Sequence, residues 1–417
     1  MPENFIPELS ATRLLPTDNS VSAAMALLQQ VPAFSSPSFN LPMLGMQLLI
    51  ATWIFVLGTC FGSFLNVVIY RLPAGLSLGR PKSRCPRCET PLAARDNIPI
   101  LGWLLLRGRC RYCQLPIAVR YPLIETVCGA VFLALLFGEL LTGASNLPLR
   151  HPDHFHVNPG FWLVWFAKWD LTGIYLFHCL LLTTVLALTM IGYDGHPPVR
   201  KLQRFGVLSG LLPGTLWFEL RPVRAAIYSN FLYDLNAGFR WPDPLSGARH
   251  MIWTGVTAIG FLDGFIGLAA GFLAGSLVKL QMRTANGTAP PSALAISSAF
   301  VVTGVFLGWQ AVGMLLLLTL PVLALAAVLV SPPDESRLKY AAPGFFVLLL
   351  IFLLTWQKLE CAAWMIGISG FQFSPLTWWQ DWLLTLGGLS LLAAVTGAVR
   401  SRTPGADADA DQHAPDA

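Results

Sequence analysis

The chain has 417 residues, of which 54% are hydrophobic and only 12% are charged, and its mean hydropathy is +0.60. Soluble domains carry about a quarter charged residues, so this composition excludes an ordinary soluble protein and indicates a membrane protein. The net charge of +5 does not indicate nucleic-acid binding, because most of the basic residues gather in one loop.

The apolar runs predict the layout of the chain in order. Residues 1–42 are polar, rich in Ser and Pro, and lack the features of a signal peptide, so they predict a disordered tail. Runs long enough to cross about 30 Å of hydrocarbon follow at roughly 44–70, 122–142, 171–193, 255–279, 293–307 with 309–330, 342–358 and 382–399, with a weaker run at 205–218. Only helices satisfy their own backbone in lipid, so the expected fold is all-α, a polytopic bundle of about eight or nine spans.

These runs also predict the domain boundaries. The first expected unit is a membrane domain over residues 43–142 with a polar loop at 71–121, and the second is a membrane domain over 143–335. Additional membrane helices are expected over 336–400, and a disordered tail rich in Ala, Asp and Pro over 401–417.

Two Cys-x-x-Cys pairs mark the polar loop. Cys85 and Cys88 form the first pair, and Cys110 and Cys113 the second. Each pair can point two sulfurs at one ion about 2.3 Å away, and zinc prefers such soft ligands. Two disulfides or idle thiols are the alternatives, and a reducing cytoplasm disfavours disulfides. A site closed by four sulfurs builds structure and does not catalyse.

The same loop is strongly basic. Its acidic residues are Glu89 and Asp96, whereas its basic residues are Arg71, Arg80, Lys82, Arg84, Arg87, Arg95, Arg107, Arg109, Arg111 and Arg120. Loops with an excess of Lys and Arg stay on the cytoplasmic side of a membrane. The sequence therefore predicts a cytoplasmic loop.

Three motifs around the cysteines carry a family resemblance. They read GSFLNVVIYRLP from Gly62, DNIPILGWLLLRGRC from Asp96 and RYPLIE from Arg120. Together they resemble the amino-terminal domain of type IV prepilin peptidases over about residues 55–130. The resemblance implies a bacterial inner-membrane enzyme that cleaves the leader of type IV prepilin or pseudopilin-like proteins and N-methylates the new amino terminus, with S-adenosylmethionine as methyl donor.

Several polar residues of these motifs are candidates for that methyltransferase activity. Arg71, Asp96 and Glu125 lie at the expected membrane boundary, where polar groups are often functional. The alternative is that they only hold the loop together, since Asp96 and Asn97 before Ile-Pro are typical of a turn.

The peptidase half departs from the family pattern. The resemblance implies that such enzymes cleave the leader with two intramembrane aspartates that share a proton. Aligning the segment ALTMIGYD that ends at Asp194 puts Gly192 at the first catalytic place. Counting back from Trp309 puts Ile296 at the second, and the Gly-x-Gly-Asp motif does not occur. Both usual carboxylates are therefore expected to be missing.

Two other carboxylates remain in this half. Asp194 follows the run at 171–193, and Asp263 lies within an apolar run. A displaced dyad of the two would need both side chains within a few ångströms and one of them protonated. A structural role for both is the alternative, as is a different polar role. Glu139 is expected at the membrane interface.

The segment HPDHFH from His151 to His156 can bind a metal, although surface His runs commonly bind nothing. Three functions remain open from the sequence. The first is a working prepilin peptidase and methyltransferase, and the second is a proteolytically inactive relative that acts as a methyltransferase or binds pilin-like helices. The third is a membrane scaffold or channel-like protein whose zinc loop only docks a partner.

Overall fold

The computed structural model describes residues 41–80, 83–85, 87–148, 169–217, 220–222, 249–283, 287–329 and 338–365. The chain divides into two compact units, Met1–Leu48 and Leu49–Ala417, and of the first unit only the start of one helix is described. The expected tails at 1–40 and 401–417, the His151–His156 loop and the run at 382–399 lie outside these residues.

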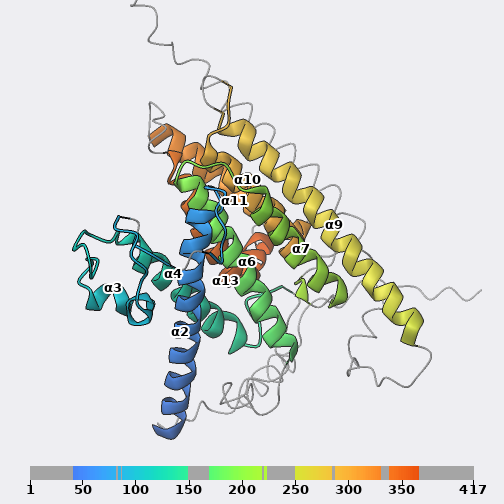
Figure 1. Ribbon diagram of the computed structural model, residues 1–417. Coiled ribbons are helices and arrows are strands. Elements are labelled where there is room, and N and C mark those ends of the chain that lie inside the picture. The colour runs from blue at the N-terminus through green and yellow to red at the C-terminus, as the bar shows by residue number, and fades with distance from the viewer. Residues whose placement is uncertain are drawn as a thin grey trace, which may run out of the picture. The chain divides into compact units, whose positions relative to one another are not determined.

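All regular elements in the described ranges are helical, and none is a strand (Figure 1). Their order is α2 (Leu41–Arg71), η1 (Ala94–Asn97), α3 (Leu101–Leu105), α4 (Arg120–Leu135), η2 (Leu136–Leu140), α6 (Trp169–Tyr193), α7 (Arg200–Leu216), α9 (Arg249–Gln281), α10 (Pro291–Leu307), α11 (Trp309–Leu329) and α13 (Ala341–Met365). The expectation of an all-α protein is confirmed.

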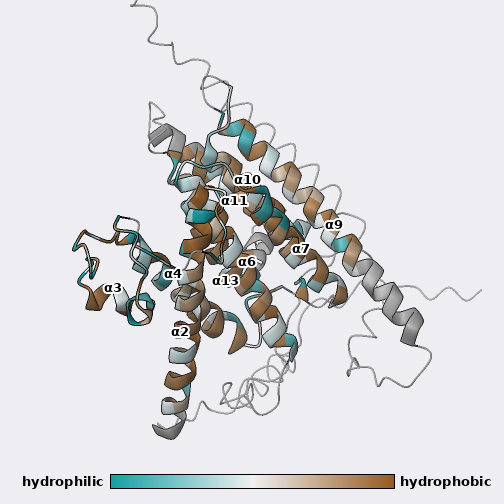
Figure 2. Ribbon diagram, viewed as in Figure 1, coloured by the Kyte–Doolittle hydropathy of each residue, from teal (hydrophilic) through white to brown (hydrophobic). Residues whose placement is uncertain are grey.

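Five of these helices are long and apolar enough to cross a membrane, and hydrophobic residues run along them (Figure 2). The spans are Leu44–Arg71, Arg120–Leu140, Trp169–Tyr193, Gly260–Gln281 and Ala341–Leu359, and two shorter apolar helices are Pro291–Leu307 and Trp309–Leu323. The weak run at 205–218 falls in α7. The expected total of eight or nine spans stays a prediction.

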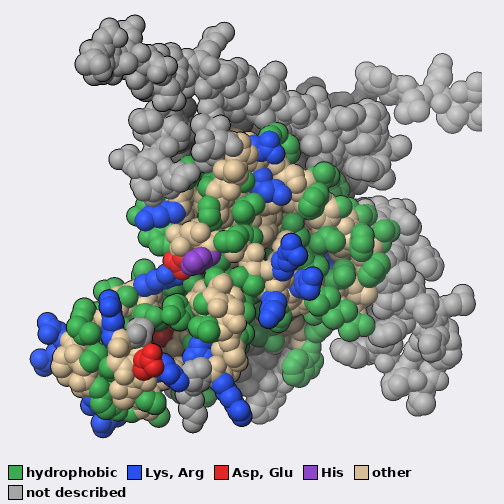
Figure 3. All heavy atoms as spheres, turned by 45° about the horizontal axis from the view of Figure 1, so that its top comes forward, with side chains coloured by type: hydrophobic (Ala, Val, Ile, Leu, Met, Phe, Trp, Pro, Cys, Tyr) green, Lys and Arg blue, Asp and Glu red, His purple; other side chains and the backbone are tan. Residues whose placement is uncertain are grey.

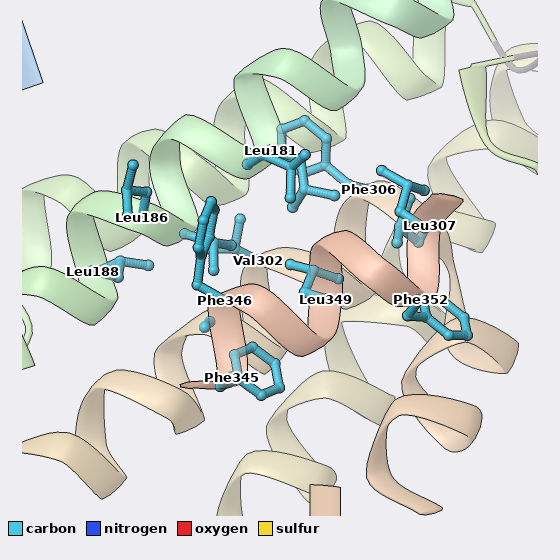
Figure 4. Packing of buried hydrophobic residues seen from close by; sticks show 14 of the residues in the cluster. Leu181, Leu186, Leu188, Val302, Phe306, Leu307, Phe345, Phe346, Leu349 and Phe352 are labelled. Carbon is cyan, nitrogen blue, oxygen red and sulfur yellow. The ribbon is translucent and has the colours of Figure 1, made fainter. Parts of the chain in front are cut away.

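Helices α6, α10 and α13 share the centre of the apolar core (Figure 4). Leu181 of α6, Phe306 of α10 and Phe352 of α13 are fully buried there, and the Phe177 and Phe306 rings lie 4.3 Å apart. Every residue of α10 from Ser292 to Leu307 except Leu294 is buried. Helix α10 is therefore the central helix of the bundle, and side chains on the helices that pack against it have little free space.

Glycines bring the neighbouring helices close to α10. On α9, a Cβ added at Gly271 would lie 2.3 Å from the Phe300 carbonyl oxygen, and Gly267 and Gly275 approach the α10 backbone in the same way. Small residues at every fourth position let membrane helices pack backbone to backbone. These contacts fix the register of α9 against α10.

Candidate functional site

The four cysteines of the polar loop form one cluster. Their Sγ atoms all lie within 4.8 Å of one another, with Cys85 and Cys113 3.8 Å apart and Cys88 and Cys110 4.0 Å apart. Four sulfurs around an ion with bonds of about 2.3 Å form a tetrahedron with edges of about 3.8 Å. The cluster therefore has the dimensions of a tetrahedral metal site, as the sequence predicted.

Both cysteine pairs use the same local turn. In the first, the Cys85 N–H donates to the Thr90 carbonyl and the Glu89 N–H to the Cys85 carbonyl, at 3.0 and 2.9 Å. The second pair repeats these bonds between Cys110, Gln114 and Leu115. The residue after each pair has a positive φ, 54° at Glu89 and 58° at Gln114. This turn aims backbone N–H groups at the sulfurs, which favours the thiolate.

The thiols of the cluster differ in their pKa values. Thr90, through its side chain and then its backbone, lowers the pKa of Cys88 to about 6. Backbone N–H groups of Cys113 and Tyr112 lower the pKa of Cys110. At Cys113, a backbone hydrogen bond from Leu115 is outweighed by burial and by the other thiols, which raise the pKa to about 11. Metal binding requires thiolates, so the loop favours the metal-binding form at Cys88 and Cys110.

Asp96 connects the loop's 3-10 turn to the second cysteine pair. Its carboxylate accepts two hydrogen bonds from the Arg111 guanidinium, at 2.8 and 2.5 Å, and this partner lowers the pKa of Asp96. The Asp96 carbonyl also lies against Gly102, where an added Cβ would be 2.3 Å away. This geometry agrees with the scaffold interpretation of Asp96.

Arg71 and Glu125 attach the loop to the membrane helices. Arg71 at the end of α2 donates to the carbonyls of Ser77 and Leu78, at 3.0 and 3.2 Å. Glu125 in α4 accepts a 2.7 Å hydrogen bond from the Ile100 N–H. Arg71, Asp96 and Glu125 thus hold different parts of the loop, and their role in methyl transfer stays a prediction.

The first of the two places that the alignment assigns to the catalytic aspartates lies at a tight contact between α6 and α10. A Cβ added at Gly192 of α6 would be 2.4 Å from the Ala295 Cβ and 3.2 Å from the Pro291 carbonyl oxygen of α10. Ile296, next to Ala295, is fully buried. Tight apolar packing therefore occupies the contact where the family pattern expects the first of two carboxylates.

Asp194 lies just beyond this contact and forms an ion pair with Arg120. Both carboxylate oxygens accept hydrogen bonds from Arg120 at the start of α4, at 2.5 and 2.6 Å. The pair is partly exposed, with 21% of the Asp194 side chain accessible. This ion pair connects the carboxyl-terminal end of α6 to the carboxyl-terminal end of the cysteine loop.

Asp263 occupies a different place in the bundle. It is buried in α9 and interacts electrostatically with Arg221, whose guanidinium also donates to the carbonyls of Gly214, Gly260 and Val305. Gly267, one turn after Asp263, contacts Gly304 near the far end of α10.

The structure does not bring Asp194 and Asp263 together. Asp194 follows the contact of α6 with Ala295, whereas Asp263 lies beyond the contact of α9 with Gly304. At 1.5 Å per residue, the stretch of α10 between these two contacts is about 14 Å long. A shared proton needs direct contact, which this arrangement does not provide. A separate catalytic role for either carboxylate stays a prediction.

The sequence did not indicate a second polar cluster deep in the bundle. The Glu139 carboxylate of η2 lies 2.7 Å from His178 Nδ1 of α6 and accepts a 3.3 Å hydrogen bond from Asn146. Asn146 also donates to the Leu353 carbonyl of α13. Glu139 and His178 are at most 1% exposed. Glu139 is also the last residue but one of the span Arg120–Leu140, so its expected place at the membrane interface stays a prediction. The sequence did contain one signal for this cluster, namely the ionisable residues Glu139 and His178 within apolar helices.

Comparison with known proteins identifies the first membrane domain. Residues 56–138 match the family described as the bacterial peptidase A24 N-terminal domain. The prepilin leader peptidase/N-methyltransferase of Myxococcus xanthus is 59% identical over 88 residues, which cover 21% of this chain and 26% of that protein. The enzyme of the same name from Klebsiella pneumoniae is 49% identical over 104 residues, covering 24% and 44%. No solved structure matches the chain.

Residues 56–138 thus match an A24 peptidase N-terminal domain, in a chain whose described elements are all helical. Over these residues the chain is similar to prepilin leader peptidases/N-methyltransferases, and the resemblance expected from the three motifs is confirmed. The chain spans about a quarter to a half of the length of the curated relatives it matches. The matched domain ends before Gly192 and Ile296.

Proposed function

We propose that this chain acts on type IV prepilin or pseudopilin-like proteins, with N-methylation of the mature amino terminus as its best supported activity. The support comes from the matched domain, which contains the complete cysteine cluster and the attached residues Arg71, Asp96 and Glu125. Relatives matched over this domain are named prepilin leader peptidase/N-methyltransferase. S-adenosylmethionine would supply the methyl group to the new terminal amine.

The cysteine cluster would hold zinc in this proposal. Four sulfurs at tetrahedral spacing suit a d¹⁰ ion that needs no open position. Cys85, Cys88, Cys110 and Cys113 would saturate the ion, so its contribution would be to fold the loop and not to activate water. We place the domain in the bacterial inner membrane, with the loop on the cytoplasmic side because of its excess of arginines.

Leader cleavage is the second candidate activity, and the relatives' names favour it. The contact between Gly192 and Ala295 argues against cleavage at the usual place, since a carboxylate at position 192 would not fit there without separating α6 from α10. A peptidase would then depend on Asp194 or Asp263, or on residues outside the described ranges. A third candidate is a protein that binds pilin-like helices without changing them.

One experiment separates these candidates. Full-length protein in lipid nanodiscs would receive either an intact prepilin or a pilin already freed of its leader, together with S-adenosylmethionine carrying a labelled methyl group. We expect label on the freed pilin and no leader removal from the prepilin. Leader removal that Asp194→Asn abolishes would overturn the second half of the proposal. Absence of label on the freed pilin would overturn the first half.

A matched pair of cysteine variants tests whether the loop is needed. Cys85→Ser removes a sulfur of the cluster, whereas Cys60→Ser removes an exposed thiol of α2 that lies outside it. Methylation should be lost in the first variant and unchanged in the second. Equal activity in both would show that the cluster does not support the reaction.

A further inference from the structure

A short helix of the cysteine loop presents an apolar face that the rest of the described chain does not cover. The face consists of Leu101, Leu104 and Leu105 on α3, which are 55, 54 and 74% exposed. Their spacing puts them on neighbouring positions of one helical turn. Between them, Trp103 turns the other way and donates its indole N–H to the Ile117 carbonyl at 3.1 Å. The leucines therefore point away from the loop's own interior.

The anchor of α3 fixes its depth relative to the membrane helices. The residue before α3, Ile100, donates its N–H to Glu125. Glu125 lies inside the span Arg120–Leu140 and packs against Gly62 of the span Leu44–Arg71, where an added Cβ would be 2.6 Å from the Glu125 Cα. Glu125 lies five positions after Arg120, a rise of about 7.5 Å along α4. Helix α3 therefore starts beside this apolar helix and not beyond its first residue.

Positive charge follows the apolar face directly. Arg107 and Arg109 come immediately after α3, and both are exposed. The nearby carboxylate of Asp96 is already bonded to Arg111, so it does not neutralise them. Figure 3 shows Lys and Arg side chains interspersed with hydrophobic ones over the described surface. Leucines beside exposed arginines are the pattern of segments that lie in the membrane interface and bind anionic lipids.

We propose that α3 is an interfacial membrane anchor, with Leu101, Leu104 and Leu105 inserted among the lipid chains and Arg107 and Arg109 bound to anionic phospholipid headgroups. The cysteine cluster is then seated on the bilayer surface through lipid contacts as well as through α2 and α4. This proposal is independent of the proposed function, because it concerns only the contact between the loop and the membrane.

Photo-crosslinking in the full-length protein tests the anchor. The photoreactive amino acid p-benzoylphenylalanine would replace Leu105, and in a control protein it would replace Glu89, whose carboxylate side chain is 78% exposed at the first cysteine pair. Each protein would be placed in nanodiscs of phosphatidylcholine alone or mixed with phosphatidylglycerol, irradiated and analysed by mass spectrometry. We expect several-fold more lipid adduct at position 105 than at position 89, and a further increase with phosphatidylglycerol.

The paired variant Arg107→Gln/Arg109→Gln tests the headgroup part of the proposal. It should remove most of the increase caused by phosphatidylglycerol and leave the adduct in phosphatidylcholine unchanged. Equal adduct yields at positions 105 and 89 would overturn the anchor, as would adducts at position 105 to a second copy of the chain or to added prepilin in place of lipid. If the protein with the probe at position 105 fails to fold, the same comparison at position 104 decides.

Discussion

The contact between Gly192 and Ala295 gives the most direct test of how α6 packs against α10. Gly192→Ala adds a methyl group 2.4 Å from the Ala295 Cβ, whereas carbon atoms pack favourably at about 3.5–4.0 Å. Helices α6 and α10 must therefore separate by about 1 Å in the core. Overpacking of this kind costs about 1–3 kcal/mol, and the better helix propensity of Ala returns about 0.5–1 kcal/mol.

A second substitution on the facing helix should reverse the effect. Ala295→Gly removes the atom that the new methyl group meets, so that the next neighbour is the Pro291 carbonyl oxygen at 3.2 Å. The double variant also exchanges the Ala and Gly propensities between the two helices. We expect each single variant to be less stable than wild type, and the double variant to be within about 1 kcal/mol of it, with a coupling energy in the usual range of about 0.5–3 kcal/mol.

Unfolding of the purified protein in nanodiscs, followed by tryptophan fluorescence, would measure these differences. Gly192→Asp should be less stable than Gly192→Ala, since a carboxylate needs more room than a methyl group. The reasoning is refuted if the effects of Gly192→Ala and Ala295→Gly simply add in the double variant, because the two side chains would then not meet. Simple restoration of the two aspartates is accordingly expected to fail unless the facing residues are also made smaller.

Three further predictions concern the loop and the second polar cluster. Purified protein should contain one zinc ion per chain, and Cys85→Ser should lose it while Cys60→Ser keeps it, as measured by elemental analysis. Glu139→Leu or His178→Leu should each destabilise the bundle by about 3–5 kcal/mol, because each leaves a buried ionisable partner alone, and the double variant should be more stable than either. The pKa of Asp96 is lowered in the folded loop, so its contribution to loop stability should be present above about pH 4 and lost as the pH falls through the folded-state pKa. Asp96→Asn should remove this acid sensitivity, as measured by protease protection of the loop.

Each of these predictions has an outcome that contradicts it. Full zinc content in Cys85→Ser would mean that the cluster is not the metal site. Additive losses in the Glu139 and His178 variants would mean that the two side chains do not act as a pair. An unchanged acid response in Asp96→Asn would assign the sensitivity to another group.

The sequence predicted those features that depend on neighbours along the chain. Hydropathy predicted the helices, and the spacing of Cys85, Cys88, Cys110 and Cys113 predicted the cluster, because both signals are local. The interpretation of Gly192 as a departure from the family pattern stays a prediction, and only the structure revealed Ala295 as the residue packed against it.

Partners that lie far apart along the chain were not predictable. Arg120 binds Asp194, and Glu139 binds His178, across intervening helices. Hydropathy assigns a carboxylate near the end of an apolar run to the membrane interface, because it takes no account of the side chain that the carboxylate contacts in the folded bundle. A short apolar stretch such as Leu101–Leu105 likewise scores as part of a polar loop, because a window of span length averages it with its arginines.

The glycines that face α10 have a consequence for how the protein is assembled. Membrane helices associate through close packing and not through exclusion of water, and the contacts of Gly267, Gly271 and Gly275 involve no ion. The helices of the second membrane domain should therefore come together in cells starved of zinc, while the cysteine loop stays unfolded. Metal supply would then act on the folding of the loop alone, in chains whose membrane helices are already inserted and packed.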